Sequence, residues 1–185
     1  MLPPQVTFLK LPAFTAKLRE EMRTQRVYQD IVLPMKHLAD SINLAFDTFG
    51  ISPILVYPSR IYDNGPGLRG TFPTRAVQDN LVSSFKSSSL APSAPRAGMF
   101  FDLGVYGIPK DVVEGRRFDG VPKARIMEAF TTKCGGAPFL YAQTFFTKQE
   151  FERTFDLTLY RQVRKKYGAE GRFVDLFDKI SSDKR

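Results

Sequence analysis

The ten residues from Phe100 to Pro109, FFDLGVYGIP, constrain the fold of this chain more than any other stretch. Side chains alternate across a β-strand, so Asp102, Gly104 and Tyr106 are expected on one face, with apolar neighbours on the other. The strand therefore has one apolar face and one polar face. A glycine within a strand leaves a gap where a flat ligand can approach the backbone, although glycines also occur in strands for structural reasons.

Length and composition narrow the classes of protein to which the chain can belong. Its 185 residues are enough for one compact domain, and we treat residues 1–185 as a single domain. The net charge of +8 favours an anionic partner or a solvated basic surface. The basic residues are dispersed and no RNA-binding motif is present, so nucleic acid is not expected as a partner. A single cysteine and a single histidine predict no disulfide and no metal site.

The periodicity of apolar residues predicts the order of the elements. It indicates a strand at 26–33, a helix at 34–49 that Gly50 stops, strands at 54–61 and 98–107, a helix at 118–134 and a strand at 138–145. This order is typical of the ferredoxin-like split β-α-β arrangement, an α+β fold with both helices on one face of an antiparallel sheet. In the helix at 118–134 one apolar side is expected to hold Val121, Ile126, Phe130 and Cys134. Thr147 and Glu150 have the spacing of a capping box, and the amphipathic ladders after them predict C-terminal helices, with a break near Asp156.

Two further segments lie outside this pattern. A short strand at 5–11 and a helix at 14–22 are expected before the first strand of the sheet. The stretch 62–97 is rich in Ser, Pro and Gly, which predicts a long surface loop inserted between two strands. A connection of this length is unusual unless it is functional or mobile.

The alternation also predicts which side chains the helices cover. The covered face is expected to hold Val27, Ile31, Phe101, Leu103, Val105, Leu140 and Ala142. The other face is expected to hold Tyr28, Asp30, Asp102, Tyr106, Tyr141 and Gln143, with either Tyr57 or Arg60 from the strand at 54–61. Tyrosines and carboxylates that converge in this way favour a ligand or partner surface, while a solvated face remains the alternative.

Six sequence blocks, in order, resemble the C-terminal half of the delta-24 sterol reductase family. This family is the diminuto-like branch of the FAD-dependent vanillyl-alcohol oxidase superfamily. The blocks are LPPQVTFLKLP, VYQDIVLPMKHL, ILVYPSRIY, FFDLGVYGIP, FLYAQTFFTKQEFERTFD and LYRQVRKKYG. The resemblance covers nearly the whole chain apart from the stretch 62–97.

The resemblance implies the cap domain of a flavoenzyme, which covers the substrate while the side-chain double bond of a sterol is reduced. FAD is the implied cofactor and NADPH the implied electron donor. An N-terminal module binds FAD in that superfamily, and no Gly-rich phosphate-binding stretch is present here, so we expect that module to be absent from this sequence. The implied partners are an FAD-binding half, in the same or a separate chain, and the sterol. The implied location is the endoplasmic reticulum membrane.

The resemblance also implies roles for individual residues within the block DxGxYGxP and its neighbours. The candidates are catalytic Tyr106 and Asp102, substrate-contacting Tyr141, Tyr57 and Gly104, and cofactor-contacting Arg60. A phenol at this place could donate or orient a proton as hydride reaches the alkene. The alternative for the block is a packing motif at the end of a strand, where Gly107 and Pro109 set a turn.

A second function stays open on the sequence alone. The chain could be a catalytically inactive homologue that keeps the cap fold and serves as a docking subunit of a larger complex, for example in an organelle. Its basic surface and the long stretch 62–97 would then contact other subunits.

Overall fold

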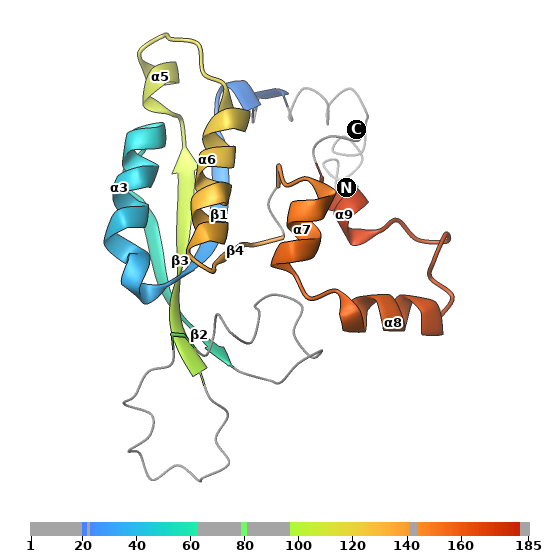
Figure 1. Cartoon of the computed structure of the whole chain (residues 1–185). Helices are drawn as coiled ribbons and strands as arrows, with labels where there is room; N and C mark the ends of the chain where they lie inside the picture. The colour runs from blue at the N-terminus through green and yellow to red at the C-terminus, as the bar shows by residue number, and fades with distance from the viewer. Residues whose placement is uncertain (1–19, 22, 63–78, 81–96, 141–143, 182–185) are drawn as a thin grey trace, which may run out of the picture.

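The computed structural model describes residues 20–21, 23–62, 79–80, 97–140 and 144–181 (Figure 1). The predicted strand at 5–11, most of the helix at 14–22 and of the stretch 62–97, and Tyr141, Ala142 and Gln143 lie outside these residues. The elements are β1 (Val27–Pro34), the 3-10 helix η1 (Met35–His37), α3 (Leu38–Phe49), β2 (Leu55–Tyr62), β3 (Ala97–Gly107), α5 (Lys110–Val113), α6 (Gly120–Lys133), β4 (Ala137–Pro138), α7 (Lys148–Thr154), α8 (Thr158–Lys166) and α9 (Leu176–Ile180).

The four strands form one sheet in the order β2-β3-β1-β4, and every neighbouring pair is antiparallel. Two crossovers, one through α3 and one through α6, connect strands that are not neighbours. This is the strand order that the ferredoxin-like arrangement requires, so the predicted α+β fold is confirmed. None of the helices among the described residues is long and apolar enough to cross a bilayer.

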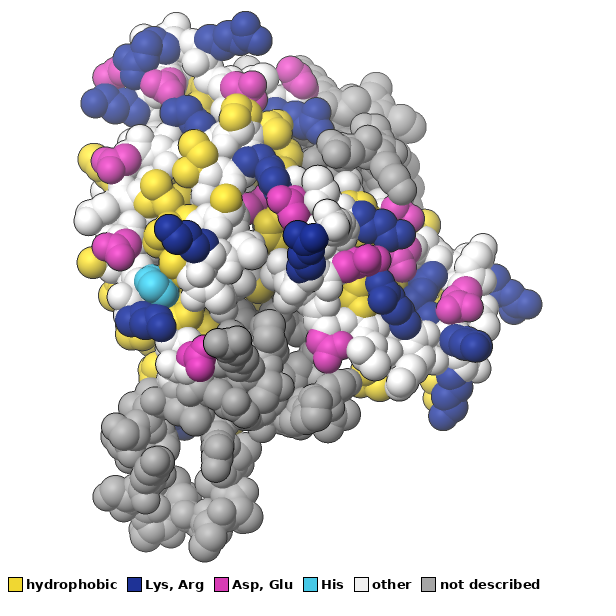
Figure 2. Space-filling model, in the orientation of Figure 1, with side chains coloured by type: hydrophobic (Ala, Val, Ile, Leu, Met, Phe, Trp, Pro, Cys, Tyr) yellow, Lys and Arg dark blue, Asp and Glu magenta, His cyan; other side chains and the backbone are white. Residues whose placement is uncertain are grey.

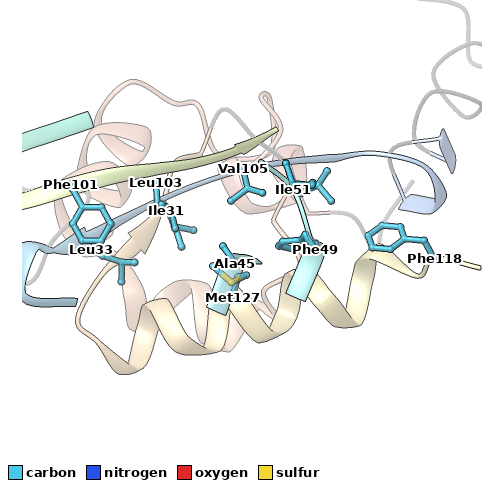
Figure 3. Packing of buried hydrophobic residues seen from close by; sticks show 11 residues of the cluster. Ile31, Leu33, Ala45, Phe49, Ile51, Phe101, Leu103, Val105, Phe118 and Met127 are labelled. Carbon is cyan, nitrogen blue, oxygen red and sulfur yellow. The ribbon is translucent and has the colours of Figure 1, made fainter. Parts of the chain in front are cut away.

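Helices α3 and α6 lie side by side on one face of the sheet and enclose the main core (Figure 1). Alternate side chains of β1 and β3 point into it, as the sequence pattern predicts, among them Ile31, Leu103 and Val105 (Figure 3). Each fully buried aliphatic or aromatic side chain contributes about 1.5–3 kcal/mol to folding. Gly50 ends α3 in the left-handed conformation at φ 62°, also as predicted.

The buried face of α6 differs from the apolar stripe that the sequence indicates. The stripe predicted Ile126 as a core residue, but its side chain is 49% exposed. The residues that α6 buries are Gly120, Ala124, Met127, Glu128 and Thr131. The helix is rotated toward these small and polar residues because Glu128 finds hydrogen-bond partners inside the protein.

A second core covers part of the other face of the sheet. Phe100 of β3 and Val32 of β1 are buried there against α7 and α9, through Phe151 and Phe177. The C-terminal helices that the sequence predicts therefore close one end of this face. Leu140, expected beneath α3 and α6, packs against this second core instead.

The strand predicted at 138–145 is shortened to β4, which spans Ala137–Pro138. A buried carboxylate accounts for the difference. Glu128 Oε1 accepts hydrogen bonds from Thr144 Oγ1 and Phe145 N, each at 2.8 Å, and so holds this segment against α6. Phe139 still donates its amide to the carbonyl of Asp30 in β1, whereas Thr144 and Phe145 are attached to α6.

Arg125 connects the same place on α6 to the first turn of α7. Its guanidinium donates to both carboxylate oxygens of Glu150, at 2.9 and 2.6 Å, and to the carbonyl of Phe145 at 3.1 Å. Glu150 also completes the predicted capping box with Thr147. These bonds hold the pKa of Glu150 at about 2, well below its usual range. The network joins the second core to the first.

We expect Glu128→Ala to lower the free energy of unfolding by about 3–5 kcal/mol, because it leaves the Thr144 hydroxyl and the Phe145 amide without their acceptor. The matched control is Glu152→Ala, which removes an exposed carboxylate paired with Arg161 and is expected to cost less than about 1 kcal/mol. Urea denaturation of both variants measures the difference. Equal losses would contradict the structural role given to Glu128.

Candidate functional site

The part of the second sheet face that α7 and α9 leave open carries the polar side chains. The register of β1 against β3 places Tyr28 opposite Tyr106 and Asp30 opposite Gly104. Residues opposite each other in an antiparallel pair share a face, so these four lie together. The ring centroids of Tyr28 and Tyr106 are 6.5 Å apart, and the two ring planes form an angle of 50°.

Strand β2 extends this face, and its register shows which of Tyr57 and Arg60 lies on it. Tyr57 is opposite Asp102 in the register, so it lies on the same face, with its side chain 64% exposed. Arg60 is opposite Met99, on the other face of the sheet. The structure therefore brings Tyr57 to the site and does not bring Arg60 there. Tyr141 lies outside the described residues.

Asp30 was expected on this face from the sequence, but it was not assigned a role there. Its carboxylate is buried at 1% exposure, and Oδ1 accepts a hydrogen bond from the Tyr106 hydroxyl. Oδ2 is buried too and has no hydrogen-bond partner among the described residues. A buried carboxylate is costly unless it is paired, so its place at the centre of a sheet points to a function. The signal available in the sequence was a charged residue inside a strand that is otherwise rich in Val, Tyr and Ile.

The gap expected above Gly104 is filled by the chain itself. A Cβ added at Gly104 would lie 2.6 Å from Cε2 of Tyr106 and 2.9 Å from Oδ1 of Asp30. The Tyr106 ring therefore folds back over the glycine and reaches Asp30. Glycine is required here for the Tyr106–Asp30 contact, and a ligand that touches the backbone at this point must first displace the ring.

Asp102 lies on the same strand as Tyr106 and on the same face. Its Oδ1 is buried and has no hydrogen-bond partner among the described residues. Burial, with a smaller effect from the negative charge of Asp30, raises the pKa of Asp102 to about 6. A carboxyl with this pKa exchanges its proton close to neutral pH, which is the property of a general acid or base.

The chemistry of the face limits what it can hold. No group of metal-binding residues occurs in the described ranges. FAD carries a pyrophosphate, and two carboxylates repel such an anion, so the described residues here do not fit the phosphate end of that cofactor. Tyrosine rings and buried acceptor oxygens fit an uncharged, largely apolar molecule that carries a hydroxyl or another hydrogen-bond donor.

We predict that the Asp102→Asn variant has a higher free energy of unfolding than the wild-type protein at pH 7, and that this difference disappears in acid. The folded chain binds the Asp102 proton more tightly than the unfolded chain, whose aspartate titrates near pH 4. The protonated Asp102 side chain therefore stabilises the folded wild-type protein below about pH 4, and this contribution is lost as the pH rises through about 6. Thermal unfolding from pH 4 to pH 8 measures the effect. Identical curves for both proteins would show that Asp102 is not desolvated.

We predict that Gly104→Ala displaces the Tyr106 ring and lowers the free energy of unfolding by about 1–3 kcal/mol. In that background Tyr106→Phe should have almost no further effect, because the bond to Asp30 is already broken. In the wild-type background the same change should cost about 1–3 kcal/mol. A double-mutant cycle by urea denaturation measures the coupling, and strictly additive losses would contradict this packing.

The comparisons with known proteins agree with the resemblance seen in the sequence. The chain is 28% identical over 180 residues to the delta(24)-sterol reductase of Rattus norvegicus and 28% identical over 185 residues to that of Pisum sativum. These matches cover 97% and 100% of this chain. A delta(24)-sterol reductase homologue of Caenorhabditis elegans is 27% identical over 181 residues, or 97% of this chain.

This chain spans about 30% of the length of the curated relatives it matches: 30%, 31% and 29% of these three proteins. No protein-family model matches it, and no solved structure matches it. The predicted resemblance is nevertheless confirmed by several curated relatives from animals and plants. Along its whole length, this chain is similar to part of the delta(24)-sterol reductases.

Proposed function

We propose that this chain is the substrate-covering part of a sterol delta-24 reductase-like oxidoreductase. The observation that carries the proposal is the open sheet face, where two partly or fully buried carboxylates and several tyrosines meet in a chain similar to sterol reductases. A sterol is an uncharged, largely apolar molecule with one hydroxyl, which is the chemistry this face fits. The cofactors of the whole enzyme would be FAD and NADPH, held mainly outside the described residues.

Reduction of a carbon–carbon double bond adds a hydride to one carbon and a proton to the other. The described residues hold no hydride donor, so the hydride must come from the cofactor-binding part of the enzyme. Asp102 is the residue suited to the proton. As the new carbon–hydrogen bond forms, the O–H bond of neutral Asp102 breaks and leaves a carboxylate, which takes up a proton from water before the next turnover.

The geometry favours a positioning role for Tyr106 over direct proton donation. Its hydroxyl hydrogen is directed to Asp30, so that proton is already engaged in a hydrogen bond. Tyr106 would instead fix the Asp30 carboxylate near Asp102 and form the floor of the site above Gly104. Tyr57 and Tyr28, both exposed, would contact the sterol from the sides.

Activity would require a partner that binds FAD, in the same or a separate polypeptide. Because the proposed substrate is a membrane lipid, we also propose that the assembled enzyme works at the endoplasmic reticulum membrane. Contacts with further subunits through the basic surface belong to the alternative below.

The alternative proposal is a catalytically inactive homologue that serves as a docking subunit. It is favoured by one observation, the Tyr106 ring that fills the space above Gly104. In this case the carboxylates would be retained from an active ancestor, and the chain would bind other proteins through its basic surface.

The test combines this chain with a separately produced FAD-binding region of a delta(24)-sterol reductase and follows NADPH-dependent reduction of a sterol side-chain double bond. We expect turnover with the wild-type chain and a loss of about a hundredfold in kcat with Asp102→Asn. Asp47→Asn makes the same chemical change at an exposed site on α3 and is expected to leave kcat unchanged. The kcat of Tyr57→Phe is compared with that of Tyr62→Phe, because the Tyr62 side chain lies on the other face of β2.

Two results would contradict the proposal. Equal kcat values for Asp102→Asn and Asp47→Asn would exclude Asp102 as the proton donor. A mixture that binds flavin but never reduces the sterol would favour the docking alternative.

A further inference from the structure

Helix α8 lies at the margin of the molecule, away from the sheet (Figure 1). It contacts the rest of the described protein through Tyr160 and Arg164, and through the ion pair of Arg161 with Glu152. The Tyr160 hydroxyl accepts a hydrogen bond from the amide of Leu176 at 2.9 Å, and Arg164 donates to the carbonyl of Phe173 at 2.7 Å. The segment 167–175 thus folds back against the side of α8 that carries Tyr160 and Arg164, while Leu159 and Val163 are exposed.

The apolar residues of α8 are exposed, although their spacing predicts a buried ladder. Leu159, Val163 and Tyr167 follow each other at intervals of four residues and form one stripe, with exposures of 42%, 43% and 73%. The ladder is broken near Asp156, as the sequence predicts, and only its first members reach the second core. Phe173 and Val174 are also exposed, at 70% and 65%. Such a concentration of exposed apolar side chains marks an interaction site.

The same region is strongly basic. Residues 158–174 contain five basic side chains and one acidic side chain, Glu170. Arg161 is paired with Glu152 and Arg164 with backbone carbonyls. The other three, Lys165, Lys166 and Arg172, form no ion pair in the part of the chain that the structure describes. Figure 2 shows Lys and Arg side chains gathered at this margin of the molecule.

We propose that α8 and the segment 167–174 form a docking surface for an anionic lipid bilayer. A helix with a basic polar face and an exposed apolar stripe binds in the plane of a membrane interface, where its apolar side chains enter the acyl boundary. The cations are attracted to acidic headgroups. Tyr167 has the amphipathic character that such an interface favours. The Lys166 ammonium lies 5.5 Å from the centroid of its ring.

The shape and charge of the region favour lipid over an acidic protein. Its apolar side chains stand on a projecting helix and on an adjoining loop, so they can enter a soft interface together without a complementary groove. The three cations that form no ion pair with described residues are spread over α8 and the following segment instead of forming a compact cluster for one acidic side chain. The inference goes beyond the proposed function, although a lipid-exposed position would suit an enzyme whose proposed substrate is a sterol.

The test measures binding of the full chain to phosphatidylcholine vesicles with and without 30% phosphatidylserine, by co-sedimentation (the phosphatidylserine fraction is about a physiological anionic load). We expect binding to the anionic vesicles that weakens as salt rises, and little binding to phosphatidylcholine alone. Joint replacement of Lys165 and Lys166 by Gln should weaken anionic binding about thirtyfold, since each lost cation lowers the affinity about fivefold.

Val163→Glu should also abolish most of the binding, because it places a charge in the apolar stripe. The matched control is Val113→Glu, at a site on α5 that is 72% exposed and far along the chain from α8. Unchanged thermal unfolding of both variants shows that they fold. Absent binding to anionic vesicles, or equal binding by the two Val→Glu variants, would overturn the inference. The assay involves no turnover, so its outcome is separate from that of the proposed reaction.

Discussion

The antiparallel pairing of β1 with β3 is the interaction on which the rest of the structure depends. These two strands occupy the centre of the sheet, and each residue of β1 has a partner on β3 from Val27↔Gly107 to Pro34↔Phe100. A slip by one residue would move every side chain to the other face. The register therefore determines at once which residues enter the core beneath α3 and α6 and which form the candidate site.

The same register places two carboxylates near the middle of the sheet, where removing a carboxylate from water costs folding free energy. Asp30 is buried, one of its oxygens has no hydrogen-bond partner in the described part of the chain, and Asp102 is desolvated beside it. The Tyr106 hydroxyl, which reaches Asp30 across Gly104, offsets part of this cost. Replacement of Asp102 is expected to gain stability at neutral pH, so its presence is better explained by chemistry at this face than by folding.

The sequence alone predicted much of the fold because the strands alternate clearly and the helix ends carry strong signals, such as Gly50. It predicted the candidate face for the same reason. Prediction from the sequence failed where a polar residue occupies a place in the interior at which an apolar residue is expected. Glu128 is buried because partners distant in sequence complete its hydrogen bonds, which no local pattern reveals. Alternation along β2 puts Tyr57 and Arg60 on opposite faces, but only the pairing of β2 with β3 shows that Tyr57 is the one on the site's face.

The central claim is that a sterol lies on the open face of the sheet, against β1 and β3. Photo-crosslinking tests this most directly: the full chain is irradiated with a sterol that carries a diazirine in its side chain, and the adducts are located by mass spectrometry. Labelling of peptides containing residues 28–30 and 102–106, and its loss on competition with unlabelled sterol, is the predicted result. Competable labelling confined to other parts of the chain, or none at all, would contradict the account.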